Sequence, residues 1–105
     1  MLFALIRQEG RGFDRSRPLR EQDAWTEHAA YIDALFDEGF VRLAGPLGDG
    51  SPVHRALLIV DADSEAMVHA RTEEDPWTPM QVLETVSVEP WELFVGELPA
   101  PTPGE

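Results

Sequence analysis

Residues 19–39 read LREQDAWTEHAAYIDALFDEG, and this stretch decides the fold. Its apolar residues recur at steps of three and four, which at about 100° per residue places them on one helical stripe. The members of this stripe are Ala24, Trp25, Ala29, Ile32, Leu35 and Phe36. Gly39 follows at the position where a left-handed residue commonly ends a helix. We therefore predict a helix over residues 19–38 that buries one face.

Short apolar segments on both sides of this helix predict strands. Residues 2–7 form a short segment that is apolar up to Arg7, and residues 8–18 carry glycine, proline and charge as a loop does. After the helix, residues 40–45 and 54–61 are strand-like and are separated by the turn-rich sequence PLGDGSP at 46–52. We expect these two strands to form an antiparallel hairpin.

The second half of the chain repeats the pattern of one helix and one strand. Residues 65–72 predict a shorter helix, with Asp63 or Ser64 as its cap. A further helical turn is expected at residues 76–80, and residues 85–89 alternate polar and apolar as a half-buried strand does. The order β-α-β-β-α-β predicts an α+β ferredoxin-like fold, in which a four-stranded antiparallel sheet carries two helices on one face.

The length of the chain sets its domain organisation. A chain of 105 residues fits one domain, which we expect at residues 1–97, followed by a proline-rich tail at 98–105. Helices on one face leave the other face of the sheet apolar and uncovered. A second copy of the same sheet is its simplest cover, which predicts a homodimer formed through the sheet faces, a dimeric α+β barrel.

Composition excludes several classes of function. The net charge is −12 and lysine is absent, so neither nucleic acid nor an acidic membrane surface is an expected partner. Without cysteine there is no disulfide or thiolate chemistry, and the three histidines lack the spacing of a metal cluster. We therefore expect no metal or cofactor. No signal peptide and no apolar run long enough to cross a membrane is evident, which predicts a cytoplasmic protein.

His28 is the first candidate for chemistry. It lies three residues after Trp25 and four before Ile32, so its imidazole falls within the apolar stripe and should point inward. A carboxylate beside it would favour proton transfer, and Asp75 is the candidate. The alternatives are a histidine at the core edge bonded to a backbone carbonyl, and an aspartate that only caps the turn after it.

Other residues are candidates for the lining of a small-molecule pocket. The glycine-rich segment at 45–50 lacks the ending of a phosphate-binding loop, and a turn at a pocket rim is its expected use. Trp77 follows the turn made by Asp75 and Pro76, where an aromatic side chain could contact a ligand. The expected pocket-lining residues are Trp25, Gly45, Pro46, Asp49, Pro76 and Trp77.

Several short motifs in this order resemble the YCII-related family, over residues 1 to about 95. They are His28 followed by Tyr31-Ile32 and Leu35, Glu38-Gly39, Ala44-Gly45-Pro46, and Asp75-Pro76-Trp77. The resemblance implies ferredoxin-like domains that pair into an α+β barrel, with His28 and Asp75 matching the proposed catalytic pair. One member acts as a dehydrochlorinase in the breakdown of a chlorinated aromatic compound.

Two functions from different classes follow from these residues. The first is a cofactor-independent isomerase or lyase, of the dehydrochlorinase type, in which His28 transfers a proton and Asp75 orients it. The second is a non-catalytic module that binds a small ligand or serves dimerisation with the same pocket. Contact between His28 and Asp75 beside an open cavity favours the first.

Overall fold

The secondary structure follows the predicted order, including the short helical turn expected at residues 76–80, and adds one 3-10 turn before the first helix. The computed structural model describes residues 1–98, so all of the predicted tail except residue 98 lies outside the described residues. The strands are β1 (Leu2–Glu9), β2 (Val41–Leu47), β3 (Arg55–Asp61) and β4 (Leu83–Pro90). The helices are α1 (Trp25–Asp37), α2 (Glu65–Glu73) and the four-residue α3 (Trp77–Met80), with a 3-10 turn η1 (Leu19–Glu21) before α1.

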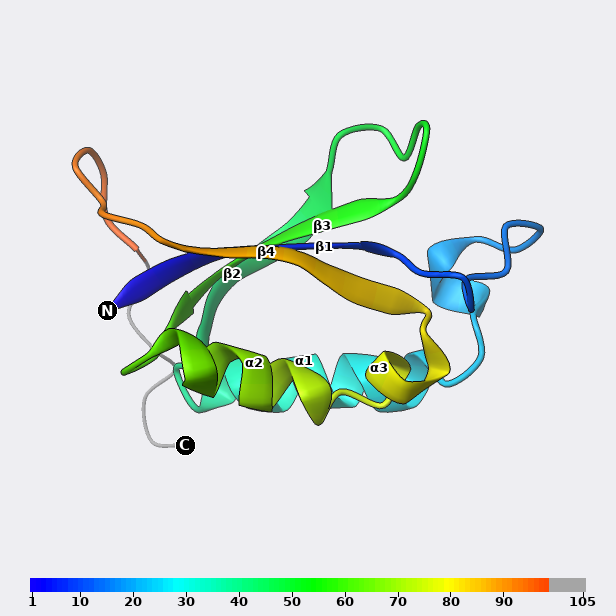
Figure 1. Cartoon of the computed structure of the whole chain (residues 1–105), viewed down its shortest axis with the longest axis horizontal. Helices are drawn as coiled ribbons and strands as arrows, with labels where there is room; N and C mark the ends of the chain where they lie inside the picture. The colour runs from blue at the N-terminus through cyan, green and yellow to red at the C-terminus, as the bar shows by residue number, and fades with distance from the viewer. Residues whose placement is uncertain (99–105) are drawn as a thin grey trace.

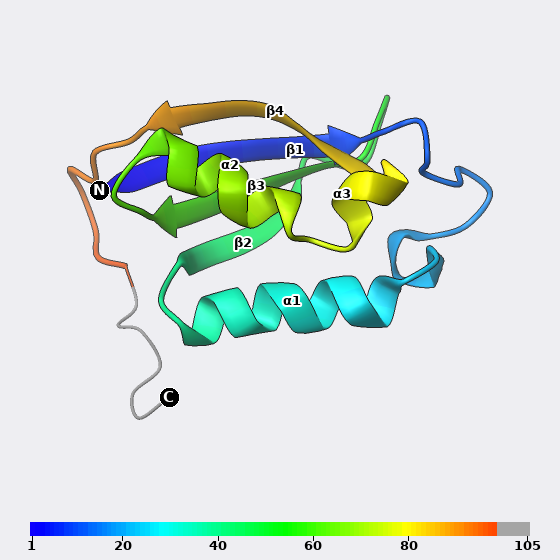
Figure 2. The ribbon, with the colours of Figure 1, turned by 60° about the horizontal axis from the view of Figure 1, so that its bottom comes forward.

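The four strands form one antiparallel sheet in the order β2-β3-β1-β4. All three α-helices lie on the same side of this sheet, as Figures 1 and 2 show. The ferredoxin-like prediction is therefore confirmed. The structure contains one chain, and the pairing of two sheets stays a prediction. Among the described residues, no helix combines the length and apolar character that a membrane span requires.

Helix α1 begins six residues later than predicted. Ala24 is left-handed with φ 61°, which interrupts the helical backbone between η1 and Trp25. The buried Gln22 stabilises this interruption, because its side-chain amide donates to the carbonyls of Asp14 and Arg17. The end of α1 agrees with the prediction, since Gly39 follows it with φ 85°.

Strand β1 continues two residues beyond its predicted end. Gln8 and Glu9, expected in a loop, pair with β4, and the backbone N–H of Glu9 donates to the carbonyl of His54. The Glu9 carboxylate is buried, where it accepts from the backbone N–H of His54 and from Arg15. Polar and charged residues such as Gln8 and Glu9 are typical of loops, which explains why the sequence predicted an earlier end of this strand.

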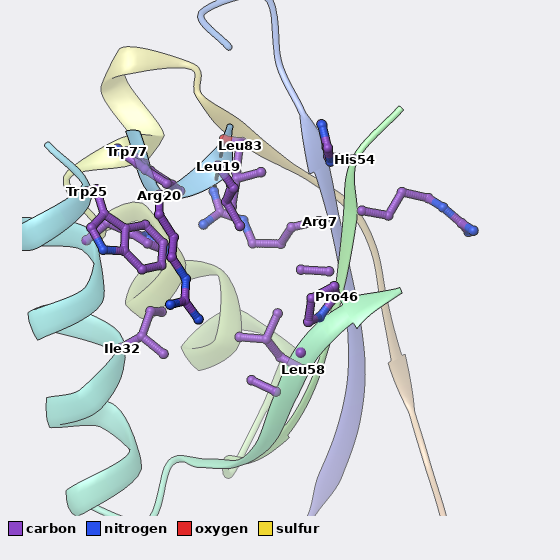
Figure 3. A pocket seen from close by; sticks show the side chains of 15 residues that line it. Arg7, Leu19, Arg20, Trp25, Ile32, Pro46, His54, Leu58, Trp77 and Leu83 are labelled. Atoms are coloured by element: carbon purple, nitrogen blue, oxygen red, sulfur yellow. Dashed lines mark hydrogen bonds between the residues drawn. The ribbon is translucent and has the colours of Figure 1, made fainter. Parts of the chain in front are cut away.

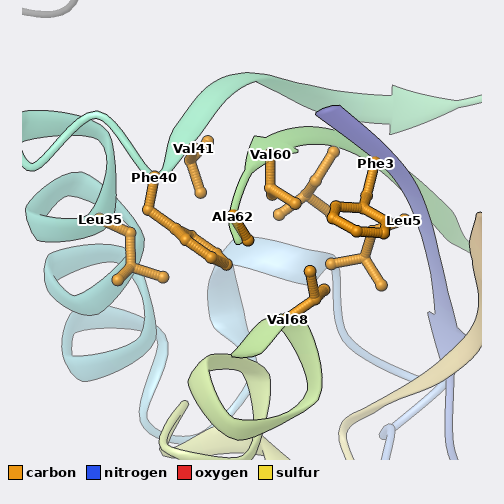
Figure 4. Packing of buried hydrophobic residues seen from close by; sticks show 9 residues of the cluster. Phe3, Leu5, Leu35, Phe40, Val41, Val60, Ala62 and Val68 are labelled. Atoms are coloured by element: carbon orange, nitrogen blue, oxygen red, sulfur yellow. The ribbon is translucent and has the colours of Figure 1, made fainter. Parts of the chain in front are cut away.

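The main core lies between the sheet and helices α1 and α2. Phe3 and Leu5 of β1 and Val60 of β3 face Leu35 of α1 and Val68 of α2 (Figure 4). Leu5, Val60 and Val68 have no exposed surface. Burying side chains of this size stabilises the fold by about 1.5–3 kcal/mol each. This core contacts the C-terminal half of α1, which contains Leu35. The N-terminal half, which carries His28, packs against other residues.

Close backbone contact brings the far end of β1 to α3. The N–H of Gly10 donates to Val82 O over 3.0 Å, and the N–H of Gly12 donates to Gln81 O over 2.9 Å. A Cβ at Gly12 would lie 2.0 Å from Met80 O, so a side chain there would force the segments apart. Glycine at these positions therefore lets the segment after β1 lie against the residues that end and follow α3.

The sheet face opposite the helices is apolar at its centre. Ile6 pairs with Leu57, Ala4 pairs with Ile59, and Leu43 on β2 also pairs with Ile59. Successive side chains of a strand point to opposite faces, so these residues point away from the core that holds Phe3 and Leu5. The exposed fraction of Leu43 is 45% in the single chain. The predicted dimer would cover this face.

Candidate active site

His28 and Asp75, 47 positions apart in the sequence, form a hydrogen-bonded pair. Nδ1 of His28 lies 2.9 Å from Oδ1 and 2.8 Å from Oδ2 of Asp75. The Asp75 side chain is almost fully buried at 1% exposed, while 12% of His28 remains exposed. Helix α1 supplies the histidine and the turn before α3 supplies the carboxylate. The alternative of a core histidine bonded only to a backbone carbonyl does not describe this geometry.

Asp75 also caps the turn that follows it. Its Oδ1 accepts from the backbone N–H of Trp77 over 2.9 Å, and its Oδ2 accepts from Nη1 of Arg7 over 3.0 Å. Burial raises the pKa of Asp75, but the hydrogen bond from His28, the Trp77 N–H and the positive charge of Arg7 outweigh burial and hold the pKa below its ordinary value. The carboxylate is therefore ionised at neutral pH.

Arg7 is the residue of the site that the sequence did not single out. Its guanidinium, 4% exposed, donates to Asp75, to Oγ1 of Thr78 over 3.1 Å and to the carbonyl of Leu83 over 3.1 Å. Burial lowers the pKa of Arg7, and the charge and hydrogen bond of Asp75 oppose that effect. A signal was present, because alternation along β1 places Arg7 on the same face as Phe3 and Leu5.

Two tryptophans fix the plane of the imidazole. The ring of Trp77 stacks on His28 with centroids 3.9 Å apart and 9° between the planes. Trp25 lies beside both rings, at 5.8 Å from His28 and 5.7 Å from Trp77. The indole N–H of Trp77 donates to the carbonyl of Asp23 over 2.6 Å. The stacked ring and the hydrogen bond from Nδ1 together define the direction of Nε2.

A cavity of about 300 Å³ opens beside His28, between α1 and the sheet. Figure 3 shows Trp25, Arg20 and Ile32 on the helix side, and Pro46 and Leu58 on the strand side. Of the six residues predicted to line a pocket, Trp25, Gly45, Pro46 and Trp77 do so. Asp49 and Pro76 are not part of the lining. Asp49 accepts from the backbone N–H of Ser51, as a turn residue does.

The pair can act as a proton acceptor. Asp75 is ionised, so Nδ1 of His28 carries the hydrogen that joins the pair, and the neutral ring then has its lone pair on Nε2. Within residues 1–98 no hydrogen bond occupies Nε2. A base of this kind is available to a molecule in the cavity. The same described residues contain no cluster of three or more histidines and carboxylates that could hold a metal ion.

Comparison with known proteins identifies a similar solved structure and the family of the chain. A solved structure of 5-chloro-2-hydroxyhydroquinone dehydrochlorinase (TftG) from Burkholderia phenoliruptrix AC1100, in complex with 2,5-dihydroxybenzoquinone, is similar at 30% sequence identity. The TM-score is 0.62, and the match covers 88% of this chain and 94% of that chain. A search of the curated proteins found no match. The family model of the YCII-related domain matches residues 1–92, and the chain therefore belongs to the YCII-related domain family.

Proposed function

We propose that the protein is a lyase-type or isomerase-type enzyme that removes a proton from a small organic molecule with Nε2 of His28. The observation that carries the proposal is the hydrogen bond from Nδ1 of His28 to Asp75 beside a cavity of about 300 Å³. Cavities of this size bind small molecules. Family membership and the likeness to a dehydrochlorinase support an elimination reaction.

Each group in the pair has a defined task in the proposed reaction. Nε2 takes a proton from the substrate, and the electron pair left behind forms a double bond. In an elimination the leaving group departs with its bonding electrons, so the substrate loses HX overall. In an isomerisation the proton returns to another atom of the same molecule. Asp75 stabilises the imidazolium formed at His28, and it does not itself need to take the proton.

Arg7 and Trp77 prepare this base without touching the reacting atoms. Arg7 keeps the Asp75 carboxylate ionised and fixed through its hydrogen bond of 3.0 Å. Trp77 holds the imidazole plane by stacking at 3.9 Å. Preorganised groups of this kind do not have to reorient during the reaction, which lowers its barrier.

The first test measures chloride release from 5-chloro-2-hydroxyhydroquinone by the purified protein. His28→Asn keeps an Nδ1-like donor toward Asp75 but has no Nε2, so turnover should fall about 10²–10⁴-fold. His69→Asn is the matched control, because His69 lies exposed on α2, where its Nε2 is 3.3 Å from Oε2 of Glu65 and outside the cavity lining.

Solvent exchange extends this test beyond one leaving group. Incorporation of deuterium from heavy water into 2,5-dihydroxybenzoate or related hydroxylated rings reports proton transfer without chloride. Chloride release or exchange that is equal in His28→Asn and the unchanged protein would refute His28 as the base. A protein that binds these rings but shows neither reaction is the alternative, a ligand-binding module.

We also propose that the protein forms a homodimer through the open sheet face. Leu43, Ile6 and Leu57 make an apolar surface there that none of the helices within residues 1–98 covers (Figure 1). Ile6→Glu should convert a dimer into a monomer in sedimentation experiments, because a carboxylate from each subunit would be buried in the proposed interface. Met67→Glu on α2 adds the same charge at an exposed site and should leave the dimer intact. A monomeric unchanged protein would contradict this proposal.

A further inference from the structure

The lining of the cavity has a charge opposite to that of the whole protein. The chain carries 20 acidic side chains against 8 arginines. Among the described residues that line the cavity, three are arginine, two are histidine, and none is aspartate or glutamate. A strongly acidic protein repels anions from most of its surface, so a lining without acidic residues marks the place where an anion can approach.

Arg20 is the arginine of this lining that is free to meet a ligand. Arg7 is committed to Asp75, as described above. Arg55 lies opposite Gln8 on the strand face shared with Leu57, which points away from the helices.

Arg20 has no ion pair or hydrogen bond with another residue in 1–98. Its guanidinium lies 6.0 Å from the ring centre of Trp25, and Figure 3 shows it on the helix side of the cavity.

The three arginines of the loop before η1 are already paired. Arg11 donates to Gln81, Arg15 contacts Glu9, and Arg17 bonds Asp14 and Asp23. These three lie on the loop before η1 and are not part of the cavity lining. In a chain with many carboxylates, an arginine without an acidic partner at the mouth of a cavity is available for an acidic group from outside the chain.

We propose that the cavity selects a small organic anion of about one ring, and that Arg20 pairs with the anionic group while the ring lies against Trp25. The anionic group is a carboxylate or an ionised ring hydroxyl. The walls fit such a ring, because Trp25, Ile32 and Leu58 supply apolar surface and the volume is about 300 Å³. Arg20 is thus a specificity residue of the proposed enzyme, and the inference rests on the proposed function only in taking this cavity as the substrate site.

The test compares two probes that share a ring and differ in charge. The dissociation constants of 2,5-dihydroxybenzoate and 2,5-dihydroxybenzamide are measured by calorimetry, with 2,5-dihydroxybenzoquinone as a probe whose ring hydroxyls ionise. The unchanged protein should bind the carboxylate about tenfold more tightly than the amide, as expected for one charge-assisted contact at a partly exposed site. Arg20→Gln should remove this preference and leave binding of the amide unchanged, and Arg20→Lys should keep most of it.

Arg11→Gln is the matched control, because it removes the same charge from the neighbouring loop and should preserve the preference. Equal binding of carboxylate and amide by the unchanged protein would overturn the inference, as would no binding of either at millimolar concentration. An Arg20→Gln variant that keeps the preference would overturn it too. If the anion binds through Arg20 but no proton transfer occurs, the proposed function fails and this inference stands.

Discussion

The helix-facing side of β1 has two halves with opposite character. Phe3 and Leu5 pack into the apolar core, whereas Arg7 and Glu9, next on the same face, are equally buried but charged. Burial of an apolar side chain stabilises the fold, while burial of a charge is unfavourable unless a partner compensates it. The first half is thus explained by stability alone, and the second half needs another reason.

Arg7 connects the second half to the candidate base, while Glu9 binds Arg15 and the backbone of His54. Arg7 reaches Asp75, and Asp75 reaches His28, so a chain of hydrogen bonds links the sheet to α1. Buried ion pairs contribute little net stability compared with apolar residues of the same shape. The comparison indicates that charged residues replace apolar packing at this end of the sheet, and that they hold the Asp75 carboxylate fixed and ionised.

Arg7→Met gives the largest effect that separates the two halves. The substitution keeps an unbranched apolar stem but leaves Asp75 without its arginine, and loss of one partner of a buried pair costs roughly 3–5 kcal/mol. The free energy of unfolding should fall by that order, measured by urea denaturation. Chloride release per folded molecule should fall as well, because the carboxylate that orients His28 is no longer held.

Leu5→Ala is the control for this prediction. It removes apolar volume from the other half at a cost of about 3 kcal/mol. Turnover per folded molecule should be retained, since Leu5 belongs to the core cluster and does not line the cavity. Equal loss of turnover in both variants would show that the two halves are one structural unit and would break the comparison.

Residue periodicity predicted the apolar half well. The α1 stripe, the glycine after it and the alternation of strands follow from local rules, and the order of elements then leaves few topologies. The start of α1 was wrong because Gln22 and the left-handed Ala24 act through contacts that no period reveals. The extra residues of β1 were missed because Glu9 is charged yet buried.

The site could be predicted only where a local pattern existed. His28 stood out as a polar residue within an apolar stripe, and Asp75 as a cap beside proline and tryptophan. Arg7 was not recognised as a site residue, because its role depends on contact with Asp75, which lies 68 positions away in the sequence. The role proposed for Arg20 also depends on the three-dimensional structure, because the sequence does not show which arginines have acidic partners.

The pH dependence of stability gives a smaller effect that sharpens the comparison. The pKa of Asp75 is held below its ordinary value in the folded state, so the unfolded chain binds this proton first as the pH falls. Stability from Asp75 is therefore complete above the unfolded pKa of about 3.9 and is lost as the pH falls through the lower folded pKa. The unchanged protein should be more stable than Asp75→Asn at neutral pH, and the two should converge in acid.

Unfolding free energies measured from neutral pH to about pH 3 test this difference. For each pH unit by which folding lowers the pKa of Asp75, protonation of this carboxylate in acid should reduce the free energy of unfolding by about 1.4 kcal/mol. Asp49→Asn, which removes an exposed carboxylate from the loop between β2 and β3, controls for the change in net charge. A gap between the protein and Asp75→Asn that stays constant or widens in acid would mean that Asp75 acts through packing alone. The charged half of the sheet would then need no ionised carboxylate, and its distinction from the apolar half would disappear.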